Sequence, residues 1–118
     1  MSRRTHRVAD LIRAELSDLL LRSVHDPRIR LVSVTDVDVS PDLRHAVVKV
    51  SVLGGDEERE STVEALRHAR GFLRSELAHR LRTMRVTPEL LFELDRGAEH
   101  SRKITDLLES LHARDESS

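Results

Sequence analysis

Hydrophobic positions near the N-terminus recur with helical spacing. Between residues 4 and 23, apolar side chains begin at Val8 and return every three or four positions, while Arg7 and Arg13 fall outside this stripe. Pro27 disfavours helical backbone at the residue before it. The pattern therefore predicts an amphipathic helix over residues 4–23 that ends before Asp26-Pro27.

Two alternating stretches follow and predict a β-hairpin. Residues 31–40, LVSVTDVDVS, are rich in β-branched side chains. Their apolar phase shifts between Val34 and Val37, which indicates either a bulge or a strand buried on both faces near its start. Residues 46–52 alternate regularly, and Ser40-Pro41-Asp42 provides turn residues between the stretches. We expect the two strands to be antiparallel.

Residues 56–82 have helical periodicity but contain Gly71. The helix can begin anywhere from Asp56, a capping residue, to Ser61, which opens a capping box. Glycine costs about 1 kcal/mol relative to alanine inside a helix. A straight helix over residues 57–82 would be about 39 Å long, whereas a compact chain of this length is roughly 35 Å across. We therefore expect two helices joined at Ala69-Arg70-Gly71 with almost no loop, rather than one long helix with a tolerated glycine.

The C-terminal third predicts one more strand and one more helix. Residues 89–95 alternate after Pro88, and apolar residues from Ile104 to Leu111 have helical spacing. The order α-β-β-α-α-β followed by a C-terminal helix predicts an α+β fold with helices packed on a three-stranded sheet. We expect one domain over residues 1–113 and a disordered tail over residues 114–118.

The amino-acid composition excludes several kinds of site and of protein. Cysteine is absent, which excludes disulfides and thiolate metal sites. No apolar run approaches the roughly 18 residues of a membrane span, so we expect a soluble, cytoplasmic protein. Phe72 and Phe92 are the only aromatic residues. We assign both to the core, which leaves no exposed ring on which an RNA base could stack.

The charges are unevenly distributed along the chain. Residues 67–85 carry six arginines and one acid, whereas residues 36–64 carry eight acids and three basic residues. A basic surface is typical of a protein that binds a polyanion, although a solvated helix face or a GC-rich genome would also produce arginine runs. The candidate RNA-binding residues are Arg3, Arg4, Arg7, Arg28, Arg67, Arg70, Arg74, Arg80, Arg82 and Arg85.

Motifs for catalysis and metal binding are missing from the sequence. It contains no nucleophile elbow, phosphate-binding loop or zinc pattern. The stretch from Asp36 begins like a calcium loop, but Pro41 and Val47 occupy the positions that require glycine and glutamate. We expect no enzymatic activity, no metal site and no cofactor.

The order of elements resembles the type II KH fold, an RNA-binding module with a GxxG loop between two helices. No glycines here have GxxG spacing, and Ala69-Arg70-Gly71 stands at that place. This Ala-x-Gly kink makes the chain resemble the KH-like family of bacterial ribosome-binding factor A over residues 3–111. One departure is Lys49-Val50-Ser51, where that family often has an aromatic residue. The other stretches that carry the resemblance are RVADLIRAELSDLL, DPR at 26–28, VTDVDVSPDLRHAVVKVSV, ARGFLRSEL and TPELLFELD.

The resemblance implies a non-enzymatic assembly factor of the small ribosomal subunit. Such a factor binds free small subunits and their rRNA near the decoding region, aids late rRNA processing, and leaves when a maturation GTPase acts. Further expected contacts are ribosomal proteins, and the expected state is a monomer. We expect the arginines to bind RNA by its shape and backbone. The alternative is a protein-binding adaptor that docks a basic ribosomal or regulatory protein through the acidic residues 36–64.

Overall fold

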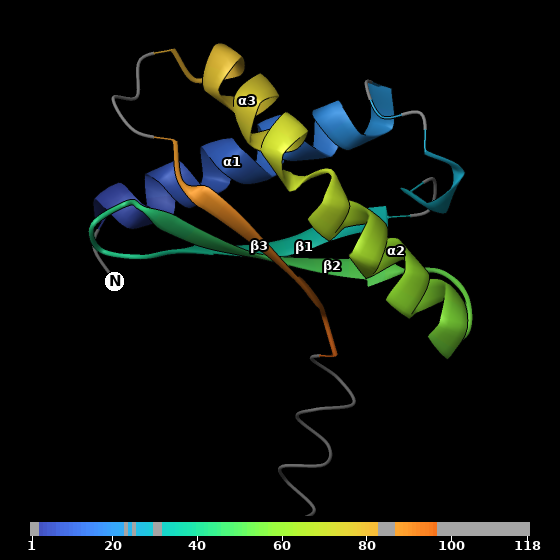
Figure 1. The fold of residues 1–118 in the computed structure, drawn as a ribbon. Helices are drawn as coiled ribbons and strands as arrows, with labels where there is room; N and C mark the ends of the chain where they lie inside the picture. The colour runs from blue at the N-terminus through green and yellow to red at the C-terminus, as the bar shows by residue number, and fades with distance from the viewer. Residues whose placement is uncertain (1–2, 23, 25, 30–31, 83–86, 97–118) are drawn as a thin grey trace, which may run out of the picture.

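The computed structural model describes residues 3–22, 24, 26–29, 32–82 and 87–96 (Figure 1). Their order confirms the predicted α-β-β-α-α-β sequence of elements. The expected last helix, the tail and the boundary at residue 113 lie outside the described residues. The elements are α1 (Arg3–Arg22), the short 3-10 helix η1 (Pro27–Ile29), β1 (Val32–Val39), β2 (His45–Val52), α2 (Asp56–His68), α3 (Arg70–Arg80) and β3 (Glu89–Leu94).

The sheet has the strand order β1-β2-β3, so β2 is central (Figure 1). β1 pairs with β2 in antiparallel fashion, as predicted, and β3 pairs with β2 in parallel. The register of the hairpin shifts between Val34 and Asp36, which leaves Thr35 as an extra residue. This bulge confirms the interpretation of the changed apolar phase, because Val34 before it and Val37 after it are both buried.

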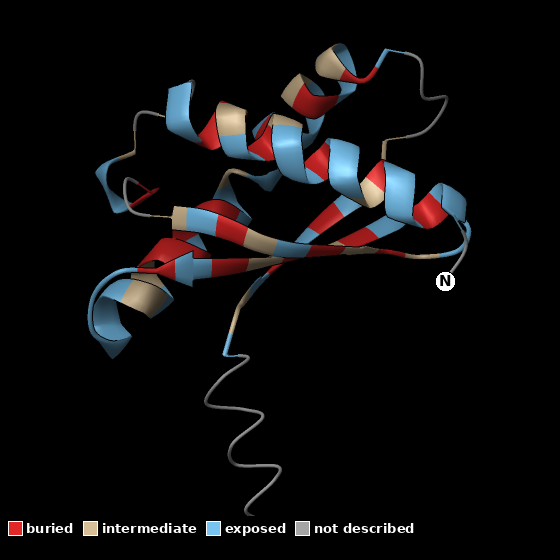
Figure 2. Ribbon diagram, turned by 180° about the vertical axis from the view of Figure 1, so that it is seen from behind, coloured by how far each residue is buried: buried red, intermediate tan, exposed pale blue. Residues whose placement is uncertain are grey.

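The helices pack on one face of the sheet and form the hydrophobic core with it (Figures 1 and 2). Figure 2 shows the buried positions recurring along α1 on the side turned toward the strands. The opposite face of the sheet carries exposed side chains such as Ser51, Glu89 and Glu93. The most completely buried large side chains include Ile12, Leu16, Leu19, Leu66, Leu73, Leu77, Leu90, Val48 and Val50.

α2 begins at Asp56, the first position of the predicted range 56–61, but it is capped differently. Its N-cap is Gly55, which makes no side-chain capping bond, so the predictions of a cap from Asp56 and of a capping box at Ser61 are wrong. The three acids of the first turn, residues 56–58, instead interact favourably with the positive end of the helix dipole.

The junction between α2 and α3 consists of Ala69 alone, with φ −86° and ψ 0°. Two helices with almost no loop are therefore confirmed, and the single long helix is excluded. The Ala69 N–H donates to the carbonyl of Ala65 at 3.0 Å, and the Leu73 N–H donates to the carbonyl of Ala69 at 2.9 Å. Gly71 lies within the first turn of α3, where an added Cβ would meet nothing within 4 Å. The change of direction thus occurs at Ala69, and glycine is not needed for it.

The two phenylalanines have different environments. Phe92 is 2% exposed, as expected for a core residue, but Phe72 is 49% exposed, so its assignment to the core was wrong. Leu73 and Leu77 are the fully buried residues of α3. Phe72 precedes Leu73 and is turned about 100° from it around the helix axis. The helix junction therefore carries an exposed aromatic ring.

Candidate nucleic-acid interface

The first turns of α1 carry Arg3, Arg4 and Arg7, all of them exposed. None of the three has an ion-pair partner among the described residues. The first turn of α1 also contains no acid, so the positive end of the helix dipole adds to their charge. Thr5 and Val8 are buried between them and hold this end of the helix against the core. The N-terminal end of α1 is therefore a fixed site of positive potential.

A second group of arginines follows the helix junction. Arg70 is exposed and has no partner among the described side chains. The Arg74 guanidinium donates to the carbonyl of Thr87 from Nε at 3.2 Å and Nη2 at 3.0 Å. Arg67 donates from Nη2 to the carbonyl of Phe92 at 3.3 Å. Both acceptors are neutral, so Arg67 is held at β3 and Arg74 at the segment before it with their charges uncompensated. A guanidinium bound in this way has further donors for a phosphate.

Arg80 instead forms ion pairs with two acids of α1. Its Nη1 lies 2.8 Å from Asp18 Oδ2 and 3.3 Å from Glu15 Oε2, which joins α3 to α1. The hydrogen bond from Arg80, with Arg22 adding to it, lowers the pKa of the Asp18 carboxyl despite partial desolvation. The same hydrogen bond raises the pKa of Arg80. Two carboxylates thus neutralise Arg80, which does not belong to the candidate interface.

Arg28 is also paired. Its backbone N–H, Nε and Nη2 donate to the Asp26 carboxylate at 2.9, 3.2 and 2.9 Å. These bonds lower the pKa of Asp26. Arg28 is therefore a poor candidate for phosphate binding.

The last two candidates follow α3 in the chain. Arg82 is exposed just beyond α3, whereas Arg85 lies outside the described residues.

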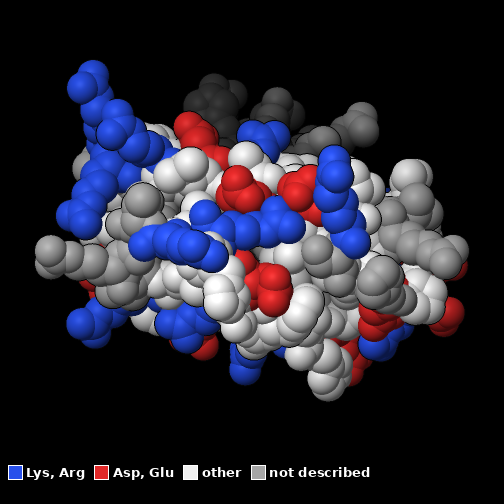
Figure 3. All heavy atoms as spheres, turned by 90° about the horizontal axis from the view of Figure 1, so that it is seen from above, with Lys and Arg blue, Asp and Glu red and all other residues white. Residues whose placement is uncertain are grey.

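The remaining arginines occur in two groups, at the start of α1 and from the end of α2 to just beyond α3. α3 contacts α1 through Arg80 at Glu15 and Asp18, and Glu15 is about 12 Å further along α1 than Arg7. Figure 3 shows acidic and basic side chains interleaved on this side of the molecule, with a basic group at one corner. We use the name arginine surface for Arg3, Arg4, Arg7, Arg67, Arg70, Arg74 and Arg82.

Sequence analysis missed one residue of this region. Phe72 is exposed directly after Arg70 and Gly71, and its position beside Leu73, outside the Leu73–Leu77 stripe, is the signal that could have revealed it. Other chemistry is not apparent in the part of the chain that the structure describes. It contains no group of three His, Cys, Asp or Glu side chains able to hold a metal ion. None of the helices described here combines the length and the apolar character that a membrane span requires.

Comparison with known proteins identifies relatives along almost the whole chain. A family model described as Ribosome-binding factor A matches residues 4–108. The chain belongs to the ribosome-binding factor A family. The ribosome-binding factor A of Caldanaerobacter subterraneus subsp. tengcongensis is 41% identical over 116 residues, which cover 98% of this chain and 94% of the relative.

Solved structures of ribosome-binding factor A have the same fold. The crystal structure of the factor from Thermus thermophilus superposes with a TM-score of 0.69 at 28% identity, covering 79% of this chain and 98% of that one. A homology model of the Thermus thermophilus factor, fitted into a cryo-EM map of its complex with the 30S subunit, gives a TM-score of 0.54 at 31% identity. It covers 70% of this chain and 90% of that one.

Proposed function

We propose that this protein is a small-subunit assembly factor that binds free 30S particles and acts without catalysing a reaction. The family match over residues 4–108 carries this proposal, and the 30S complex of the Thermus thermophilus relative supports the choice of subunit. On this proposal the protein is a cytoplasmic monomer that contacts rRNA near the decoding region, aids late rRNA processing and is released by a maturation GTPase.

The arginine surface provides a mechanism for this binding. Arg3, Arg4 and Arg7 at the start of α1 are exposed and not neutralised by described acids, and the same holds for the arginines from the end of α2 to just beyond α3, which are Arg67, Arg70, Arg74 and Arg82. Guanidinium groups bind phosphate bidentately. Two separated groups match two stretches of RNA backbone and fix the orientation of the protein without reading sequence. Arg80 contributes indirectly, because it holds α3 against α1.

Sedimentation with ribosomal particles tests the proposal. We expect wild-type protein to co-sediment with free small subunits, and not with large subunits or joined ribosomes, and to dissociate as salt is raised. Replacing Arg70 and Arg74 together by glutamate should weaken binding and reduce the log–log salt slope by about 0.7–0.9 for each phosphate that the variant no longer binds. Arg44→Glu is the matched control, because Arg44 is exposed at the β1–β2 turn outside the arginine surface.

Two results would contradict the proposal. One is co-sedimentation that shows no preference among the three kinds of particle. The other is small-subunit binding that is insensitive to salt and unchanged in the Arg70/Arg74 variant, which would remove the arginine surface from the mechanism.

A further inference from the structure

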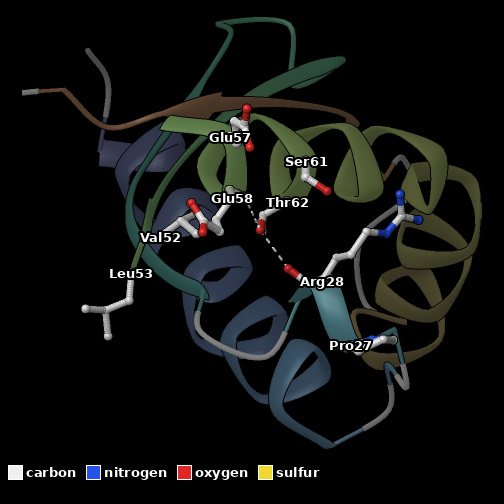
Figure 4. Close-up of a pocket in the computed structure, with 8 residues that line it drawn as sticks. All are labelled: Pro27, Arg28, Val52, Leu53, Glu57, Glu58, Ser61 and Thr62. Carbon is white, nitrogen blue, oxygen red and sulfur yellow. Dashed lines mark hydrogen bonds between the residues drawn. The ribbon is translucent and has the colours of Figure 1, made fainter. Parts of the chain in front are cut away.

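A hollow of about 640 Å³ lies at the end of α2 that is remote from the helix junction. It is bounded by η1, the end of β2 and the first turns of α2 (Figure 4). Pro27, Val52 and Leu53 supply its apolar surface, and Glu57 and Glu58 lie beside them. We name it the η1–α2 hollow. None of its lining residues belongs to the arginine surface.

Leu53 is the most informative residue of the hollow. Its side chain is 71% exposed and points out from the rim (Figure 4). Gly54, the next residue, has φ +129°, a conformation that side-chain-bearing residues rarely adopt. This turn fixes the direction in which the chain leaves β2, so Leu53 is held in water rather than folded into the core. Unlike an isolated exposed leucine, Leu53 extends an apolar wall that Pro27 and Val52 also line, where an aliphatic side chain of a partner can be buried.

The walls of the hollow are fixed by internal bonds. The Thr62 hydroxyl lies 2.7 Å from the carbonyls of both Arg28 and Glu58, and it is placed to donate to either, which ties η1 to α2 (Figure 4). The Arg28 guanidinium is paired with Asp26, so its charge is compensated. The site therefore exists before any ligand arrives, and less ordering is needed on binding.

The charge of the hollow determines what can occupy it. Glu57 and Glu58 have no cationic partner among the described residues. The other acids of α2 contribute less, because Asp56 is paired with Arg59, Glu60 is paired with Arg96, and Glu64 lies 3.7 Å from His68. Phosphate groups of a nucleic acid or an anionic lipid would be repelled here. An apolar wall beside unpaired carboxylates is instead complementary to a polypeptide that combines an apolar side chain with lysine or arginine.

We propose that the η1–α2 hollow binds an extended segment of a basic protein, with one aliphatic side chain packed against Leu53 and Val52 and its cations paired with Glu57 and Glu58. This second surface is separate from the arginine surface. The protein would accordingly contact RNA through one region and a protein through another. Because the two surfaces share no residue, each can be removed without changing the other.

A labelled peptide containing Arg-Leu-Lys between Gly-Ser spacers is a direct probe. Its binding would be measured by fluorescence anisotropy and mapped by backbone amide NMR shifts. We expect Leu53→Ser and Glu57→Lys each to weaken binding roughly five- to tenfold, with wild-type shifts concentrated on residues 52–62. The matched controls are Leu21→Ser, another exposed leucine, and Glu60→Lys, an exposed acid of α2 that does not line the hollow. Neither control should change the affinity.

The outcomes separate this inference from the proposed function. Loss of peptide binding in the two hollow variants, with unchanged salt-dependent binding to small subunits, supports the inference. Equal affinity in wild type and both variants, shifts centred elsewhere, or no binding of the peptide would overturn it. Retention of binding by a control peptide with serine for leucine and glutamate for the cations would also overturn it.

Discussion

Gly71 and Gly54 are both exposed, but they differ in what a side chain would encounter. A Cβ on Gly71 meets nothing within 4 Å, and the backbone there is helical. A Cβ on Gly54 would lie 3.0 Å from Glu58 Cβ, and φ is +129°. The fold thus requires glycine at position 54 and does not require it at position 71.

Gly71→Ala should therefore stabilise the free protein by up to about 1 kcal/mol, since alanine lowers the entropy of the unfolded chain and favours helix. The midpoint of urea unfolding measures this. If the glycine instead lets RNA backbone approach the junction, the same variant will bind small subunits more weakly while being more stable. A lower stability of Gly71→Ala would contradict this prediction, because it would mean that the junction excludes a side chain at position 71 although no described contact does so.

Gly54→Ala should destabilise the protein by about 1–3 kcal/mol, because a left-handed backbone conformation and a crowded Cβ both oppose alanine. The same urea titration measures the effect, with Gly71→Ala as the matched comparison. Unchanged stability would show that the β2–α2 turn can relax, and it would weaken the view that Leu53 is held in place by that turn.

At the level of elements, the bridge between α1 and α3 depends on Arg80 and two acids of α1. Its hydrogen bond lowers the pKa of Asp18, so the pair stabilises the folded state when the pH is above the ordinary aspartate pKa of about 3.9. The contribution is lost as the pH falls through the lowered pKa of folded Asp18.

Comparing Asp18→Asn with the wild type over pH tests this bridge. We expect the variant to melt at a lower temperature near neutral pH. The gap should close as the pH falls from about 4 through the lowered pKa of folded Asp18, where its carboxyl becomes protonated. Asp10→Asn is the matched control on α1, since Asp10 is exposed and has no ion pair among the described residues. A gap that persists unchanged in acid would exclude the ion pair as its cause.

Periodicity and turn residues predicted the helices and strands well, because these elements depend on residues that are close together in the sequence. The phase change around Thr35 revealed the bulge. The glycine within a long apolar pattern led to the correct prediction of a junction, although the chain changes direction at Ala69 and does not require Gly71 for it. The partners of Arg80 could not be predicted in this way, because they depend on where α3 crosses α1 and lie 62 and 65 positions away in the sequence. The partner of Arg28 is Asp26, only two residues away, so this pair was open to prediction from the sequence. Phe72 was misassigned because its apolar ring was taken to indicate the core, although it lies outside the helical phase of the buried Leu73 and Leu77.

At the scale of the whole molecule, the acidic and the basic binding surfaces lie on different elements. α2 presents acids at its start, whereas exposed arginines follow the junction and begin α1. A net charge of −1 therefore conceals two surfaces suited to different partners. Local charge, rather than the total, governs which macromolecule approaches each one.

The parallel pairing of β2 with β3 also has a consequence for how the chain acquires its fold. It joins residue 45 to residue 89, whereas the β1–β2 hairpin is closed by a short turn. A chain made from its N-terminus can form the hairpin and begin α2 while β3 has not yet been synthesised. Until then β2 is an edge strand with unpaired backbone groups. We expect the docking of β3, the longest-range pairing of the described sheet, to be the slow and vulnerable stage of folding during translation.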